Sequence, residues 1–259
     1  MSWLSIFLAV IPVFIILLLV YSKDKNKEPL SLLIILFLSG LLSCGLVLII
    51  TDIFGIFLPF VKSDNKNIIE ILIYSFIVVA LVEEFCKFIM VMLIGYNHKE
   101  YDEDYDILIY SIFVSLGFAF IENLLCIANN ESIKLAIMRG ISAVPSHACD
   151  AVFMGYFLSL AKKAHINKDF SSEKKNIILS LILPTILHGV YDFLIMSKID
   201  FAKYFFIVFV ILLYIVSFRR LKSVSGKNEK LNKQLSFCKK CGRPLTGNIC
   251  SNCGQVHNL

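Results

Sequence analysis

Four groups of ionisable residues interrupt otherwise apolar segments of this 259-residue chain. The first group lies in ALVEEFCKFIM at residues 80–90, where Glu83, Glu84 and Lys87 are the charged side chains. Between residues 68 and 96 the only other charged side chain is that of Glu70. Carboxylates in apolar surroundings can act as general bases or as metal ligands. The segment therefore predicts a functional site rather than a simple apolar helix.

The other three groups combine carboxylates, an amide and imidazoles. They are Glu122 and Asn123 in GFAFIEN, His147 and Asp150 in VPSHACDAVFMGY, and His188 and Asp192 in LPTILHGVYDF. Residues three or four positions apart share one face of a helix. Asp150 and Asp192 can therefore each accept the second ring N–H of the neighbouring histidine and fix its tautomer. Carboxylates combined with two imidazoles predict a hydrolytic or metal-binding site.

Seven apolar segments can carry these residues through a membrane. The chain is 58% hydrophobic, whereas soluble domains are about 45–50% apolar. A membrane-spanning helix needs roughly 20 mainly apolar residues. We therefore predict an all-α, polytopic bundle of about seven transmembrane helices. The predicted spans are residues 3–21, 30–51, 68–96, 107–128, 141–161, 177–197 and 203–218.

Most loop Lys and Arg residues lie on one predicted side of the membrane. The start, MSWLSIFLAV, lacks the basic flank of a cleavable signal, so we expect a retained first helix. The positive-inside rule then predicts a multi-pass cell-membrane protein with its N-terminus outside and its C-terminus in the cytoplasm. The net charge of +5 reflects this topology, and no nucleic-acid partner is expected. In this topology all four polar groups lie between the middle of the membrane and its outer side.

The third segment needs partners within the bundle. Its three central charges cost on the order of 8 kcal/mol on the insertion scale, whereas its Leu, Ile, Val and Phe residues return about 6 kcal/mol. Neutralising contacts from other helices are therefore expected. We expect Glu83 to pair with Lys87, four positions along the helix, and Glu84 to face another group.

The C-terminal tail has the spacing of a zinc ribbon. Cys238 and Cys241 form one C-x2-C pair, and Cys250 and Cys253 form a second after eight residues. Four thiolates at this spacing predict a closed, structural zinc site. The alternative of two disulfides disagrees with a reducing cytosolic location. We expect a membrane domain at residues 1–220, a linker at 221–235 and a cytosolic ribbon at 236–259, which could bind a cytosolic protein partner.

Taken together, the motifs resemble those of the PrsW family of intramembrane proteases. The resemblance covers roughly residues 1–220 and rests on EEFCK, FAFIEN, the His147 group and HGVYD. It implies an endopeptidase that cuts a membrane-anchored protein, such as an anti-sigma factor, in regulated intramembrane proteolysis. The lipid bilayer and the substrate are then the expected partners.

The resemblance also implies roles for the site residues. Glu83 or Glu84 would be the general base, and we favour Glu84. Asp150 and Asp192 would orient the imidazoles, Lys87 would tune Glu83, and Asn123 belongs to the second motif. A catalytic metal, with zinc the first choice, and a metal-free glutamate mechanism both stay open at this point. The residues that would hold the metal, or otherwise polarise water and the scissile carbonyl, are Glu122, His147 and His188.

Two other classes of function fit parts of the sequence. Inward-facing Glu, His and Asp residues also form relays in proton- or ion-coupled transporters, although the seven segments show no inverted repeat. A non-catalytic scaffold that recruits a partner through its zinc ribbon is the second alternative. Proteolysis by the purified protein distinguishes the protease from both.

Overall fold

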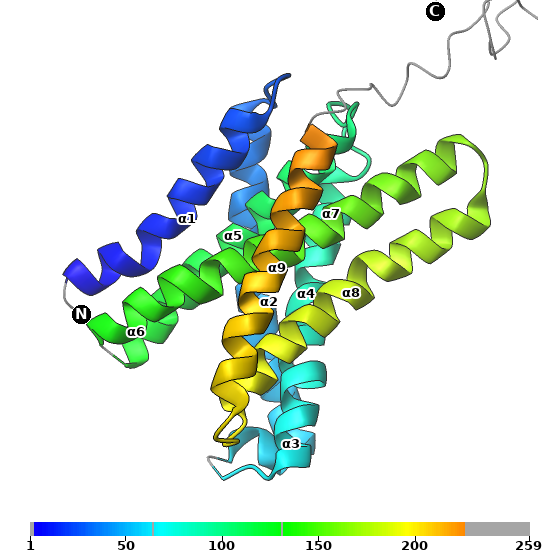
Figure 1. The fold of residues 1–259 in the computed structure, drawn as a ribbon. Helices are drawn as coiled ribbons and strands as arrows, with labels where there is room; N and C mark the ends of the chain where they lie inside the picture. Colours follow the sequence, from blue (N-terminus) through cyan, green and yellow to red (C-terminus); the bar gives the residue numbers. More distant parts are fainter. Residues whose placement is uncertain (1–2, 64, 131, 226–259) are drawn as a thin grey trace, which may run out of the picture.

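The computed structural model describes residues 3–63, 65–130 and 132–225, and these residues form helices joined by short loops. Apart from the short η1, the described helices form seven long helical segments, here called rods (Figure 1). Two of these rods consist of several consecutive shorter helices. No β-strand occurs in the described part. The single-helix rods are α1 (Trp3–Lys23), α2 (Leu30–Phe57), α5 (Asp104–Asn129), α8 (Phe170–Met196) and α9 (Ala202–Ser225).

The two composite rods are the ones that carry the first and third polar groups. Each contains π-helical turns, which occur frequently at functional sites. The first rod joins α3 (Ile68–Ile73), η2 (Tyr74–Leu81), α4 (Val82–Met90) and η3 (Val91–Gly95), after the short helix η1 (Pro59–Lys62). The second joins α6 (Ile133–Met138), η4 (Arg139–Ala143) and α7 (Val144–Ile166).

The prediction of an all-α membrane bundle is confirmed. The five single-helix rods are long and apolar enough to cross a membrane. The boundaries differ from the prediction at several ends. The fifth rod begins at residue 133 rather than 141, the sixth at Phe170 rather than 177, and α9 continues to Ser225 rather than ending at 218. The extensions at 170–176 and 219–225 are mainly polar, and hydropathy alone does not detect a helix that continues beyond the apolar core. The extension at 133–140 is mainly apolar but contains Lys134 and Arg139, which led to its assignment to a loop.

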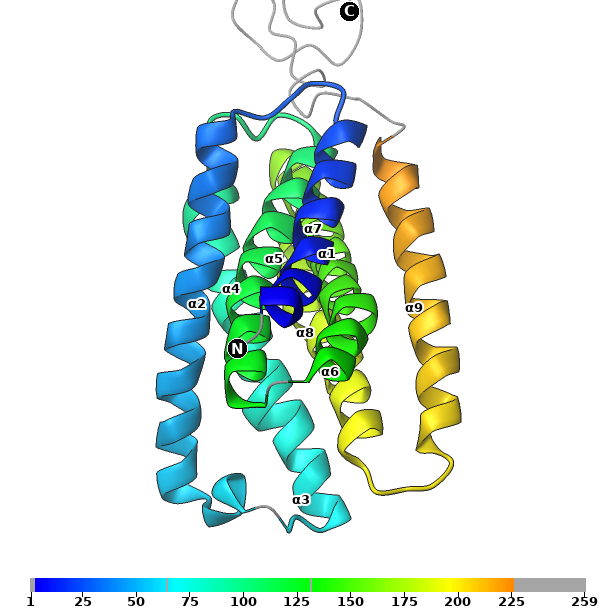
Figure 2. The same cartoon turned by 90° about the vertical axis from the view of Figure 1, so that its left-hand side faces the viewer.

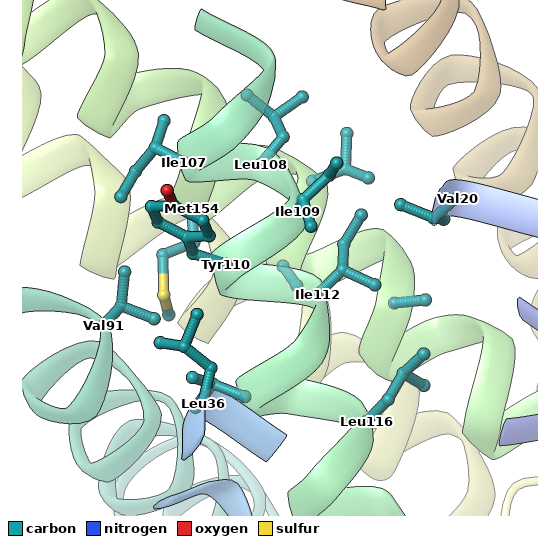
Figure 3. Packing of buried hydrophobic residues seen from close by; sticks show 14 of the residues in the cluster. Val20, Leu36, Val91, Ile107, Leu108, Ile109, Tyr110, Ile112, Leu116 and Met154 are labelled. Carbon is teal, nitrogen blue, oxygen red and sulfur yellow. The ribbon is translucent and has the colours of Figure 1, made fainter. Parts of the chain in front are cut away.

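α5 lies at the centre of the bundle, and its first half is buried on all sides. Successive residues from Ile107 to Tyr110 are all buried, which is typical of a helix surrounded by other helices. Figure 3 shows this helix packed against Leu36 of α2, Val91 of η3 and Met154 of α7. The core around α5 therefore fixes the helices that carry the polar groups.

Two glycines allow α2 and α5 to approach closely. A methyl group placed on Gly117 would lie 2.1 Å from the carbonyl oxygen of Phe37, and one on Gly40 would lie 2.0 Å from that of Val114. Small residues that permit such backbone contact are common between membrane helices. This contact fixes the part of α5 that carries Phe118 and, one turn later, Glu122 of the second polar group.

The loops gather at two ends of the bundle. Figure 2 shows the α1–α2 connection at the same end as the C-terminal end of α9, and the α8–α9 connection at the opposite end beside α3. This arrangement agrees with helices that run alternately up and down. The tail from residue 226 onward, including the linker beyond 225 and the predicted ribbon, lies outside the described residues.

Buried carboxyl groups cluster where α1 meets α2. Glu28, in the loop before α2, accepts a 2.5 Å hydrogen bond from the Tyr110 hydroxyl of α5. Burial is the main reason that the pKa of Glu28 rises from 4.5 to about 7. Repulsion from Asp24 and Glu100 adds to this rise in pKa, and hydrogen bonding by Tyr110 and Asp106 opposes it. The folded state therefore favours the protonated form of Glu28.

This raised pKa predicts a loss of stability toward alkaline pH. The stabilising contribution of protonated Glu28 is complete below about pH 4.5 and is lost as the pH rises through about 7. Glu28→Gln is neutral at every pH, so we expect it to raise the melting temperature at pH 8 on the order of 3–5 °C and to change it little at pH 5. Thermal melts in detergent at both pH values measure this, with the exposed Asp52→Asn as control. Equal shifts at the two pH values would contradict the prediction.

Candidate active site

The four polar groups meet inside the bundle. Glu83, Glu84 and Lys87 lie on the first turns of α4, Glu122 and Asn123 on α5, His147 and Asp150 at the start of α7, and His188 and Asp192 on α8. Hydrogen bonds and ion pairs connect residues that are as far apart in sequence as Glu84 and His188. The sequence-predicted residues therefore belong to one site, which four helices build.

The ammonium group of Lys87 is the hub of this site. Its Nζ lies 2.7 Å from Glu84 Oε1 and 3.4 Å from Glu83 Oε2. It also lies 3.2 Å from His147 Nδ1 and 4.2 Å from the centre of the Phe118 ring. Only 1% of the lysine is exposed, so these contacts compensate a charge that burial would otherwise strongly destabilise. The expected pair with Glu83 forms, but Glu84 is the closer partner.

His188 is held between carboxylates on both sides of its ring. Its Nδ1 lies 2.9 Å from Glu84 Oε1. Its Nε2 lies 3.4 Å from Asp192 Oδ2 and 3.8 Å from Glu83 Oε2. Asp192 therefore lies within reach of the ring, as its helical spacing predicted, and Glu84 faces the nitrogen on the opposite side.

His147 is held by a second carboxylate, which sequence reasoning did not place there. Its Nε2 lies 2.9 Å from Glu122 Oε2, and the other oxygen of Glu122 lies 2.7 Å from Arg139 Nη2. Arg139 Nε donates a hydrogen bond of 2.6 Å to the side-chain oxygen of Asn123. A fifth span that begins at 141 leaves Arg139 in an outer loop, whereas the structure places it in η4, inside the fifth rod. The sequence feature that could have identified Arg139 is its position directly before an apolar segment that contains a histidine.

Four donor residues converge at one point of the site. Glu84, His147, Asp150 and His188 are all buried, and each offers one donor atom within 4.8 Å of the donor atoms of the others. Glu84 Oε2 and Asp150 Oδ1 are buried oxygens without a hydrogen-bond partner in the described part of the chain. Carboxylate oxygens and imidazole nitrogens are zinc ligands, so this donor set fits a metal ion. Glu122 lies outside the set because it faces the other nitrogen of His147.

The charge balance of the site also favours a cation. Glu83 and Glu84 share Lys87 as their ion-pair partner, Asp192 lies beside His188, and Asp150 Oδ1 has no hydrogen-bond partner in the described part of the chain. Carboxylates in a medium of low dielectric constant need compensating charge. A metal ion would supply it.

A cavity of about 720 Å³ opens onto the site. Glu83, His147, Asp150 and His188 line its polar part, whereas Glu84 is fully buried behind them. Side chains of α2, η2, α5, α6, η4 and α8 and the start of α9 form the remaining walls, and they include Glu122 and Arg139. A water molecule and a peptide bond can therefore reach Glu83 more directly than Glu84.

Comparisons with known proteins agree with this geometry. Residues 28–217 match the family described as "PrsW family intramembrane metalloprotease". The Protease PrsW of Oceanobacillus iheyensis is 39% identical over 82% of this chain and 91% of its own length. The Protease PrsW of Clostridioides difficile is 30% identical over 86% and 92%, and that of Geobacillus kaustophilus is 35% identical over 80% and 85%. No solved structure matches the chain significantly.

Proposed function

This chain belongs to the PrsW family of intramembrane metalloproteases, and we propose that Glu83 activates the water with which it cuts a membrane-anchored protein. The chain is thus a membrane-embedded peptidase, which leaves the transporter and scaffold alternatives without support. The observation that carries the role of Glu83 is its position. It lines the cavity next to the four converging donor residues, whereas Glu84 is fully buried.

Glu84, His147, Asp150 and His188 would hold the catalytic metal, with zinc the first choice. The set differs from the expected one, because Glu84 and Asp150 replace Glu122. When bound, zinc polarises a carbonyl and makes its bound water more acidic. The two orphaned carboxylate oxygens of Glu84 and Asp150 support this assignment.

Glu83 moves the proton in the proposed reaction. Its carboxylate takes a proton from the attacking water, the new C–O bond forms, and the same proton passes to the leaving nitrogen as the C–N bond breaks. Lys87, 3.4 Å away, and His188, 3.8 Å away, orient the carboxylate. Asp192 in turn holds the ring of His188.

The proposed substrate is a single-pass membrane protein, such as an anti-sigma factor. Apolar walls that include Val47, Leu48 and Phe206 support an apolar peptide segment as the ligand. Backbone groups of a membrane helix are already hydrogen-bonded to one another, so the substrate must unwind locally before it can be cut. The distribution of Lys and Arg supports an N-terminus outside the cell and a cut near the outer side.

The C-terminal tail is proposed to bind a second, structural zinc ion. We keep the prediction of a structural zinc site at Cys238, Cys241, Cys250 and Cys253, which rests on their spacing. Its cytosolic position would let it bind a partner without entering the reaction.

Reconstitution with a defined substrate tests the proposed function. Liposomes would contain the purified chain and a single-pass protein with a cytosolic sigma-factor-binding domain. We expect a metal-dependent cut inside the transmembrane segment or at its outer edge, located by mass spectrometry of both fragments. A matched substrate with its segment replaced by a stable poly-leucine helix should be cut much more slowly. Cleavage confined to the cytosolic domain would contradict the proposal.

A further inference from the structure

Arg139 connects three parts of the bundle behind His147. Its guanidinium contacts Glu122 through Nη2 at 2.7 Å and Asn123 through Nε at 2.6 Å. Asn123 in turn donates a hydrogen bond of 2.9 Å to the backbone carbonyl of Ala9 in α1. The side chain of Arg139 is 17% exposed, so it is largely enclosed. α1, α5 and η4 thus hold Glu122 in one place.

The partners of His147 determine which ring nitrogen carries the proton. Arginine is always charged, and Glu122, as its ion-pair partner, is a carboxylate that only accepts hydrogen bonds. His147 Nε2, 2.9 Å from that carboxylate, must therefore be the donor. On the other side Lys87 has only protons to offer, and its Nζ lies 3.2 Å from Nδ1. Both contacts select the neutral ring with Nε2–H and a lone pair on Nδ1.

The ion pair with Arg139 keeps Glu122 from turning toward the cavity, where its carboxylate would be solvated. Its side chain is 29% exposed and, like Arg139, it lines the cavity. Without a cation beside it, the carboxylate would be better solvated if it turned into the cavity. It would then leave the ring of His147 without an acceptor at Nε2.

We propose that Arg139 is a positioning residue for the protease reaction: it holds Glu122 against Nε2–H of His147, so that Nδ1, on the side of the ring that faces Lys87, carries the lone pair. The proposal deepens the proposed function, because it names Nδ1 as the atom through which His147 would bind the metal. Residues behind a metal-binding histidine fix its tautomer and orientation in this way. Lys87 selects the same tautomer, and its ammonium must move away from Nδ1 when a metal is bound there.

Two measurements on the full-length chain test this role. The first is ¹⁵N NMR of ring-labelled histidines in metal-free protein, with the His147 signals assigned by their absence in His147→Asn. We expect a protonated Nε2 and an unprotonated Nδ1 in wild type, and a mixture of tautomers in Arg139→Gln. The second is zinc affinity, measured by competition with a coloured chelator after the four tail cysteines are replaced by serine. Arg139→Gln should weaken zinc binding by about 10–100-fold.

Two further variants, Lys62→Met and Arg139→Lys, distinguish a positioning role of Arg139 from a role in folding. Lys62→Met removes an exposed cation that pairs with Asp52 outside the site, and it should change neither measurement. If Arg139→Gln does not fold, Arg139→Lys replaces it. Lysine can keep the ion pair with Glu122 but not the second contact with Asn123, so zinc affinity should fall less than in Arg139→Gln and the Nε2–H tautomer should remain the major one.

An unchanged tautomer together with a zinc affinity within about threefold of wild type in Arg139→Gln would overturn the role of Arg139. The role of Arg139 would also be overturned if Arg139→Lys lost the Nε2–H tautomer as completely as Arg139→Gln does. If wild type itself binds no zinc, the proposed metal centre fails. The NMR measurement on metal-free protein then still decides the role of Arg139.

Discussion

Proteolysis by a Glu83→Gln variant is expected to fall by about 10²–10⁴-fold, while the protein stays folded and still binds its metal. The amide has nearly the same size as the carboxylate but cannot accept the proton from water, and general acid–base groups contribute about this factor. Glu83 lines the cavity and lies outside the four converging donors, so its loss should leave those donors in place. Initial cleavage rates in liposomes and metal content of the same preparation provide the two readouts.

Glu84→Gln is the informative comparison. Glu84 contacts both Lys87 and His188, and it is one of the four converging donors. Its amide should therefore weaken metal binding as well as proteolysis. Asp52→Asn, an exposed carboxylate-to-amide change, should alter neither. The opposite pattern, with full activity in Glu83→Gln and an inactive but metal-loaded Glu84→Gln, would return the role of base to Glu84.

The second large effect concerns the metal. In a full-length chain whose four tail cysteines are replaced by serine, we expect close to one bound metal ion per chain. His188→Ala and Asp150→Asn should each reduce this occupancy by roughly 10-fold or more at limiting metal, because each removes one of four ligands. Activity should fall in parallel. Elemental analysis and cleavage rates on the same samples measure both quantities.

Asp150→Asn distinguishes the loss of a metal ligand from misfolding of the site. His188→Ala also removes the contacts with Glu84 and Asp192, so a loss of metal there could follow from a collapsed site. Asp150→Asn keeps the size of the side chain, and Asp150 Oδ1 has no hydrogen-bond partner among the described residues to lose. Stoichiometric metal in both folded variants would exclude this ligand set. Full activity of wild type after complete metal removal would favour the glutamate mechanism.

The sequence by itself predicted the membrane bundle and most of the residues that meet in the site. Apolar length predicted the five single-helix spans, because a mainly apolar segment of about 20 residues is stable in lipid. Charged residues within such segments need partners there, which identified the groups around Glu83, Glu122, His147 and His188. The helical spacing of His188 and Asp192 also predicted their contact, since three or four residues make one turn. These inferences depend on local composition or on one helix at a time.

Only the tertiary structure decided which member of each group faces which partner. Adjacent residues such as Glu83 and Glu84 differ by about 100° around the helix axis, and packing against α5, α7 and α8 selects the one that lines the cavity. The same packing turns Glu122 to the far nitrogen of His147, adds Asp150 to the converging donors and brings in Arg139. These choices depend on rotations and offsets between helices distant in sequence, which no local pattern encodes. The relative orientation of the helices therefore decided the chemistry assigned to each residue.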